Sequence, residues 1–255
     1  MNQIILWNDM TLFWGSNPKA VSEHRHPSIQ LILAPQNSFS SKNNEGEWIE
    51  KTGLLIAPNF FHECNAKNVQ ILSVDIDPES ALGEWILKHQ LKDQKIIDFL
   101  PQSIKGFNYE ELSDYFENKQ WNTIRKIIES SVLYEQTYEP SQKDDRIENV
   151  LKFISQNINK PINTKNLTEV AFLSESRLLH LFKENMGLPI RNYILWFRLK
   201  IVLTQIMKGN SLTKSAYAAG FSDQAHMTRT CVNMIGVSPS TFSKNSKFIQ
   251  VSYPS

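Results

Sequence analysis

The sequence predicts an α+β protein in which a β-rich N-terminal part precedes an all-helical C-terminal part. Apolar residues form short separate runs up to about residue 77 and recur at helical spacing from about Pro78 onward. The charge changes as well: residues 1–140 hold 12 basic and 19 acidic side chains, and residues 141–255 hold 15 basic and 7 acidic ones. The net charges are therefore −7 and +8, and a basic half that follows an acidic one favours contact with a polyanion.

The composition is that of a folded protein with room for two domains. Hydrophobic residues make up 41% and charged residues 21% of the 255 positions. No apolar run reaches the roughly 18 residues of a membrane span, and the N-terminus lacks the basic start of a signal peptide. Cys64 and Cys231 lie far apart in the sequence, which suits a reducing compartment. We therefore expect a cytoplasmic protein without a membrane anchor.

Short apolar runs separated by polar turns predict β-strands in the N-terminal part. Strands at this spacing are typical of a small sandwich or barrel, and we expect a small β-barrel domain over residues 1–78. Between two of the strands, Asn37–Glu47 has the composition of a polar loop. The expected strands include Ser28–Ala34, Gly53–Ala57 and Val69–Ile76.

Helical spacing follows over residues 79–136. We expect helices over Glu79–His89, Glu110–Asn118 and Asn122–Glu135. This helical extension would either pack on the β domain or form a dimer interface, and the sequence does not choose between them. The last of the three helices carries one apolar stripe, formed by Ile124, Ile127, Ile128 and Val132. Residues 137–144 are polar, contain Pro140 and are predicted to be a linker.

The C-terminal part, residues 145–247, opens with an amphipathic helix and continues with an internal repeat. The helix spans Arg146–Asn157, with Asp144 or Asp145 as its cap. The repeat recurs at an offset of 48 to 50 positions. Each copy has small or apolar residues on one helix, a turn, a Ser/Asp cap, a second helix and a terminal Gly. This order predicts two helix-turn-helix units.

A single long helix over Ile190–Lys208 is expected to join the two units. Its nineteen residues would span about 28 Å at ~1.5 Å each, and successive major-groove faces of B-DNA lie ~34 Å apart. Such a helix can hold two reading helices about one DNA turn apart. It can also be a core element that merely connects two subdomains.

Four segments in this part carry a specific pattern. They are LSESRLLHLFKENMGLP at residues 173–189, RNYILWFRL at 191–199, AGFSDQAHMTR at 219–229 and GVSP at 236–239. With these motifs, residues 144–245 resemble the DNA-binding domain of the AraC-type transcription regulators. The resemblance implies that the partner is double-stranded DNA, bound by two tandem helix-turn-helix units.

Within that resemblance, the second helix of each repeat supplies the base-reading side chains. Arg suits guanine O6 and N7, Gln suits adenine N6 and N7, and Leu offers an apolar contact to a thymine methyl. The candidates for base reading are Ser176, Arg177, Leu179 and His180 in the first repeat and Gln224, Ala225, Thr228 and Arg229 in the second. The candidates for phosphate contact are Lys165, Lys183, Arg198, Lys200 and Lys244.

The second repeat departs from the family pattern at Ser215, Cys231, Val232 and Ser243. Cys231 stands where the family usually has a large aromatic residue. Such an exchange leaves a costly void in a core unless neighbours such as Met227, Met234 or Phe242 fill it. We therefore expect the first repeat to carry more of the base reading and the second mainly to position the domain.

The N-terminal part resembles the cupin-type sensor domain that is often joined to such regulators. The resemblance lies in HRHPSIQ at residues 24–30 and APNFFH at residues 57–62. On a strand, His24 and His26 would point to the same face. The resemblance groups them with Gln30 and His62. These residues would bind a divalent transition metal ion (Zn²⁺, Cu²⁺, Ni²⁺ or Fe²⁺), line a pocket for an organic ligand, or form a structural cluster.

The sequence thus predicts a transcription regulator, not an enzyme, that responds to a small-molecule effector in its N-terminal domain. A homodimer is compatible with the helices at residues 79–136, and an activator would also contact RNA polymerase. The alternative is a metal-dependent cupin enzyme, or a metal sensor, fused to a DNA-binding domain. Two cysteines are too few for a Cys₄ zinc-activated DNA-repair acceptor, and the charge of +8 disfavours a pure protein-interaction module.

Overall fold

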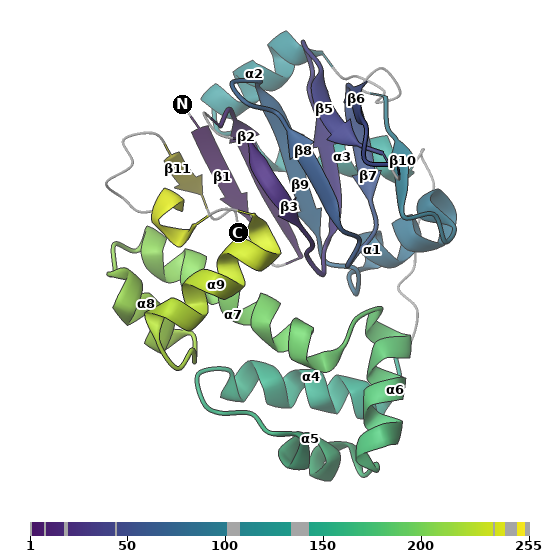
Figure 1. Ribbon diagram of the computed structural model, residues 1–255, viewed down its shortest axis with the longest axis vertical. Helices are drawn as coiled ribbons and strands as arrows, with labels where there is room; N and C mark the ends of the chain where they lie inside the picture. The colour runs from purple at the N-terminus through teal and green to yellow at the C-terminus, as the bar shows by residue number, and fades with distance from the viewer. Residues whose placement is uncertain are drawn as a thin grey trace. The chain divides into compact units, whose positions relative to one another are not determined.

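The structure is a computed structural model of the chain, and its backbone contacts divide it into two compact units (Figure 1). The N-terminal unit comprises Met1–Glu23, Ser28–Pro140 and Phe248–Ser255, and the C-terminal unit comprises Ser141–Lys247 together with His24–Pro27. The structure describes residues 2–7, 9–17, 20–43, 45–100, 108–133, 143–236, 238–242 and 249–252.

The described part of the N-terminal unit is β-rich, as predicted, and its strands form two β-sheets that do not close into one barrel. The first sheet is antiparallel except at one edge, where β1 pairs with β11 in parallel. In order of pairing, its strands are β10 (Ile96–Asp98), β7 (Gly53–Ile56), β4 (Ile29–Leu33), β9 (Ile71–Ile76), β2 (Met10–Gly15), β1 (Asn2–Leu6) and β11 (Ile249–Ser252). The second sheet has the order β3 (Val21–His24), β8 (His62–Asn65), β5 (Phe39–Lys42) and β6 (Trp48–Lys51).

The predicted loop Asn37–Glu47 contains strand β5, so that prediction was wrong. In β5, Phe39 and Ser41 are buried while Ser40 and Lys42 are half-buried. This alternation is a strand pattern, but three of the four side chains are polar and the burial of Ser41 depends on the neighbouring strands. The segment forms a strand because it pairs with β6 and β8, and neither pairing can be recognised from the local sequence.

Central strand β4 is buried on both faces because each face meets a different layer. Leu31 and Leu33 pack in the main core, which the helices of the unit also enter. Ile32 points the other way and packs with Phe39 and Cys64 of the second sheet. A strand that is apolar at every position, as β4 nearly is, therefore marks the middle layer of the unit.

The three helices that the sequence predicted are present, and the first of them changes from an α-helix to a π-helix. Helix α1 (Ala81–Trp85) starts at its cap Ser80 and continues as a π-helical turn, η1 (Ile86–Leu91), that ends where Lys92 adopts a φ of 44°. Helices α2 (Tyr109–Glu117) and α3 (Trp121–Leu133) follow. All of them contribute side chains to the main core, so the apolar face of the extension packs on the β domain.

Helix α3 is also fixed by an ion-pair network. The Arg125 guanidinium donates two parallel hydrogen bonds to the Asp9 carboxylate, both 2.8 Å long, and a third of 2.7 Å to Glu129. Asp9 lies between β1 and β2, so the network joins α3 to the start of the first sheet. These charge-assisted bonds raise the pKa of Arg125 further above its ordinary value.

The C-terminal unit contains the predicted helices at nearly the predicted bounds (Figure 1). Asp144 caps the first helix, as its sequence position indicated. The helices are α4 (Asp145–Asn157), α5 (Thr164–Ala171), α6 (Glu175–Met186), α7 (Ile190–Met207), α8 (Leu212–Ala218) and α9 (Gln224–Ile235), followed by the 3₁₀ turn η3 (Pro239–Phe242). No helix in the part of the chain that the structure describes is long and apolar enough to cross a membrane.

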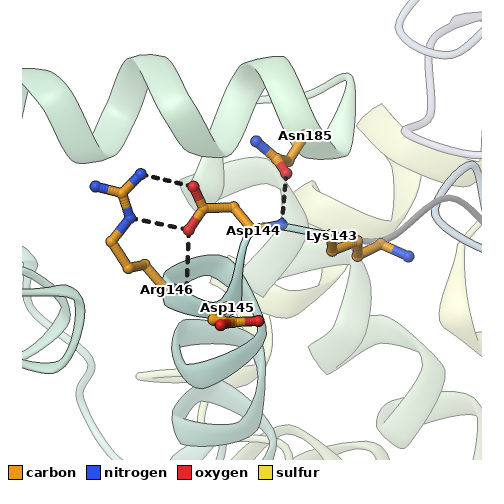
Figure 2. A pocket seen from close by; sticks show the side chains of 5 residues that line it. All are labelled: Lys143, Asp144, Asp145, Arg146 and Asn185. Carbon is orange, nitrogen blue, oxygen red and sulfur yellow. Dashed lines mark hydrogen bonds and ion pairs between the residues drawn. The ribbon is translucent and has the colours of Figure 1, made fainter.

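A shallow polar depression at the start of α4 contains none of the predicted site residues (Figure 2). Arg146 donates two hydrogen bonds to the Asp144 carboxylate, of 2.9 and 2.6 Å, and thereby lowers the pKa of Asp144 to about 2. Asn185 accepts a hydrogen bond from the Asp144 backbone N–H. This last bond joins the start of α4 to the end of α6.

The Arg125–Asp9 network yields a stability prediction. Replacing Arg125 by Ala should lower the free energy of unfolding by about 1–2 kcal/mol, because Asp9 loses both bonds of a half-buried pair. Urea unfolding followed by tryptophan fluorescence measures the change. The control is Lys126→Ala at the next, exposed position of α3. Equal midpoints for the two variants would contradict this role.

A second stability prediction concerns Phe172, which ends α5 in the left-handed region with a φ of 53° and is 92% exposed. A side chain in this conformation is strained and gains little from packing here. Phe172→Gly should raise the free energy of unfolding by about 0.5–1 kcal/mol. The matched change Gly220→Ala in the second repeat should destabilise, since a Cβ would lie 2.3 Å from the Ile158 carbonyl oxygen. Thermal unfolding of both variants distinguishes these effects, and a less stable Phe172→Gly would refute the strain.

Candidate nucleic-acid interface

The first helix-turn-helix unit is formed by α5 and α6. Asn163 and Asn166 form a capping box at the start of α5, and Ser174 caps α6 by accepting a hydrogen bond from the Arg177 backbone N–H. Helix α6 ends at Gly187, whose φ is 69°. Its buried stripe consists of Leu178, Leu181, Phe182 and Met186. The stripe fixes which side of α6 faces the solvent.

The solvent side of α6 brings together all the base-reading candidates of the first repeat. Ser176, Arg177, Leu179 and His180 are exposed. Leu179 is 40% exposed although its side chain is apolar, which suits a contact with a partner outside the unit. The His180 ring lies 3.6 Å from the Glu184 carboxylate one turn further along. This face therefore offers an Arg, a His, a hydroxyl and an apolar side chain for the edges of bases.

The second unit is formed by α8 and α9, with Gly220 at the turn. Gly220 has a φ of 79° and lies close to α4. Asp223 caps α9 by accepting a hydrogen bond of 2.7 Å from the His226 backbone N–H, which lowers the pKa of its carboxyl group. Met227 and Cys231 are fully buried in the core of this unit.

The packing around Cys231 agrees with the compensation expected from the sequence. Met227 is in the same buried cluster, and Met234 and Phe242 pack against it. Burial raises the pKa of the Cys231 thiol to about 12, so this side chain behaves as a small hydrophobic residue. Position Ser243 lies outside the described residues.

The base-reading candidates of the second repeat also lie on the solvent side of their helix, but two polar neighbours there are engaged. Gln224, Ala225 and Arg229 are exposed, and Thr228 is half-buried. The Gln224 side-chain oxygen accepts a hydrogen bond of 2.7 Å from the Thr213 hydroxyl on α8.

His226 has its own partners. Its ring lies 3.2 Å from the Ser222 hydroxyl and edge-on against Phe221. The side chains at the start of α9 are thus held by more contacts with neighbouring side chains than those at the start of α6.

The residues predicted to contact phosphates differ in how far they are exposed. Lys165 and Lys183 are exposed, Lys200 is half-buried and Lys244 lies outside the described residues. Arg198 donates hydrogen bonds of 3.2 and 2.9 Å to the carbonyl oxygens of Ile158 and Lys160, at the end of α4. Partial burial lowers its pKa. These bonds give Arg198 a structural part that the sequence did not reveal.

Helix α7 joins the two units by contributing to both cores. Ile190 and Tyr193 near its start pack with the first unit, and Leu199, Val202 and Ile206 pack with the second. Its 18 residues span about 27 Å. The interpretation as a core element is confirmed, and the role of α7 as a spacer on DNA stays a prediction.

The N-terminal candidates are all buried. His24 ends β3, His26 precedes β4 and His62 begins β8. The His62 Nδ1 is 3.0 Å from the Phe60 carbonyl oxygen, an arrangement that orients Nε2 as the ligand atom. Gln30 is engaged elsewhere, since its amide donates to the Ser73 hydroxyl at 3.3 Å. Binding of a divalent ion or of an organic ligand by this group stays a prediction.

Comparison with known proteins supports the interface. Residues 167–245 match the family model described as a helix-turn-helix domain. A curated relative, "Probable transcriptional regulator LumQ" from Photobacterium leiognathi, is 24% identical over 243 residues, which are 88% of this chain and 92% of the relative.

Two solved structures of ToxT from Vibrio cholerae share the fold along most of the chain. Apo ToxT matches with a TM-score of 0.58 at 11% identity, over 91% of this chain and 95% of that one. ToxT with a bound unsaturated fatty acid matches with a TM-score of 0.55 at 13% identity, over 92% and 95%. The family match shows a helix-turn-helix domain over residues 167–245, and the likeness to ToxT shows a shared fold. The chain is thus similar to a probable transcriptional regulator along most of its length.

Proposed function

We propose that the regulator binds operator DNA with α6 and α9 in successive major grooves, and that an effector bound by the N-terminal unit changes its affinity for DNA. The observation that carries the proposal is the pair of capped helices, each with its apolar stripe buried and its predicted reading residues on the solvent side. The net charge of +8 over residues 141–255 supplies attraction to the phosphates.

Within this proposal, α6 carries more of the base discrimination than α9. Arg177 and His180 at α6 are exposed and combine with the apolar Leu179. At α9, the amide of Gln224 is bonded to α8, and Ala225 offers only a methyl group. Arg229 and Thr228 are the other side chains of α9 that contact the bases in this proposal. Lys165, Lys183 and Lys200 serve the phosphates, which position the protein without sequence information.

The effector of the N-terminal unit is proposed to be a small molecule. ToxT, which shares the fold, has been solved with an unsaturated fatty acid and with a naphthalenyl butenoic acid. In this chain, His24, His26, Gln30 and His62, which the sequence pattern groups, are the residues proposed to bind a ligand or a divalent metal ion. A ligand shifts DNA affinity only through its different affinity for two states of the protein.

Two partners complete the proposal. A second copy of the chain would form a homodimer, and RNA polymerase would be contacted if the regulator activates transcription. Sedimentation analysis with and without operator DNA tests the first, and transcription in vitro with purified polymerase tests the second.

The ranking of the two helices predicts different losses of specificity. His180→Ala should reduce the ratio of operator to random-duplex affinity by more than Gln224→Ala does, by roughly 1 kcal/mol or more. Fluorescence anisotropy at a stated salt concentration measures both affinities. Lys152→Ala, exposed on α4, is the control that should change neither. A larger loss for Gln224→Ala would reverse the ranking.

The phosphate assignment predicts a change in salt dependence. Lys183→Ala should weaken operator and random DNA alike and reduce the slope of log affinity against log salt by about 1. Arg198→Ala should instead lower the melting temperature, since the middle of α7 loses its link to the residues at the end of α4. A Lys183 variant that loses affinity only for the operator would contradict its phosphate role.

A further inference from the structure

We infer that Thr213 determines which base Gln224 reads, by turning the Gln224 amide so that it presents its N–H₂ group to the DNA. A Gln held in this way selects guanine, and not the adenine that an unconstrained Gln prefers. The inference rests on the proposed function, because it specifies the reading at one position of the second helix-turn-helix unit.

The geometry lies within one unit and joins its two helices. Thr213 is the second residue of α8, and Gln224 is the first residue of α9. The Thr213 Oγ1 donates to the Gln224 Oε1 over 2.7 Å, the usual length of a hydrogen bond from a hydroxyl group. Ser211 caps α8 and Asp223 caps α9, so both ends of the bond are carried by helix starts of defined direction. The first residues of the second helix are the ones that contact base edges in this motif.

The neighbouring carboxylate does not compete for the amide of Gln224. Asp223 accepts the His226 backbone N–H at 2.7 Å through one oxygen and the Ser222 hydroxyl at 3.1 Å through the other. The Gln224 side chain is exposed, and its nitrogen is fixed once its oxygen is directed at α8. The Gln224 amide therefore offers two N–H donors to a ligand.

Base selectivity follows from the inventory of donors and acceptors in the major groove. The paired contact between Gln and adenine requires the amide oxygen to accept from N6 while the nitrogen donates to N7. Here the bond from Thr213 turns the oxygen toward α8, so that the nitrogen and not the oxygen is presented to the base. Guanine presents two adjacent acceptors, O6 and N7, and both suit an N–H₂ group. The hydroxyl of Thr213, which does not itself need to touch DNA, thus acts as a positioning group.

The test is selection of duplexes from a randomised library by the full-length protein. Four proteins are compared: the unmodified chain, Thr213→Val, which removes the hydroxyl at nearly constant shape, Thr213→Ser, which retains it, and Gln224→Ala. We expect the unmodified chain and Thr213→Ser to enrich guanine at one position. Thr213→Val should enrich adenine there, with a change in preference of roughly five- to hundredfold. Gln224→Ala should show no preference at that position.

Three results would overturn the inference. They are adenine at the Gln224-dependent position with the unmodified chain, an unchanged guanine preference in Thr213→Val, and the same consensus in Gln224→Ala as in the unmodified chain. Failure of the proposed function looks different, because the unmodified chain would then enrich no sequence at all. Circular dichroism and melting curves of the four proteins confirm that the exposed substitutions leave the fold intact.

Discussion

Burial of the apolar surface of α7 is the interaction on which the DNA-binding half depends. Residues near its start close the core of the first helix-turn-helix unit, and residues further along close the core of the second. Neither unit can therefore turn freely about the helix without exposing its own core. Arg198 strengthens the same joint by binding the carbonyl oxygens at the end of α4. The spacing and the relative orientation of α6 and α9 are consequences of this packing, and recognition of DNA follows from them.

The N-terminal unit is likewise held together by an element that packs into two cores, here the strand β4. Strand β4 lies between two layers, and the helices α1 to α3 cover the face of the first sheet that the second sheet does not. The network of Arg125, Asp9 and Glu129 holds α3 in place on that face. For the sensing that we propose, the unit needs a rigid frame of this kind, since coupling between two places requires discrete alternative arrangements of packed elements.

Much of the fold could be predicted because its signals are local. The caps Asp144, Ser174 and Asp223 and the terminal Gly187 and Gly236 stand at the expected ends of their helices. What the sequence did not reveal depends on distant partners: strand β5 in a polar segment, the division into two sheets, and β11, which pairs with β1 from the far end of the chain. The same holds for the candidate site. Exposure of the reading residues followed from helical periodicity, whereas the bonds of Arg198 and Gln224 to other helices required the structure.

In the proposed function, one chain presents two reading helices at a spacing that α7 fixes. This arrangement is tested most directly by inserting about five base pairs, half a helical turn, between the two recognition elements of a selected operator. We expect this insertion to leave at most the specific contacts of a single element, and an insertion of about ten base pairs, a full turn, not to restore the affinity of two elements, because α7 fixes the spacing. Undiminished specific affinity for the operator with the half-turn insertion would contradict this role of α7.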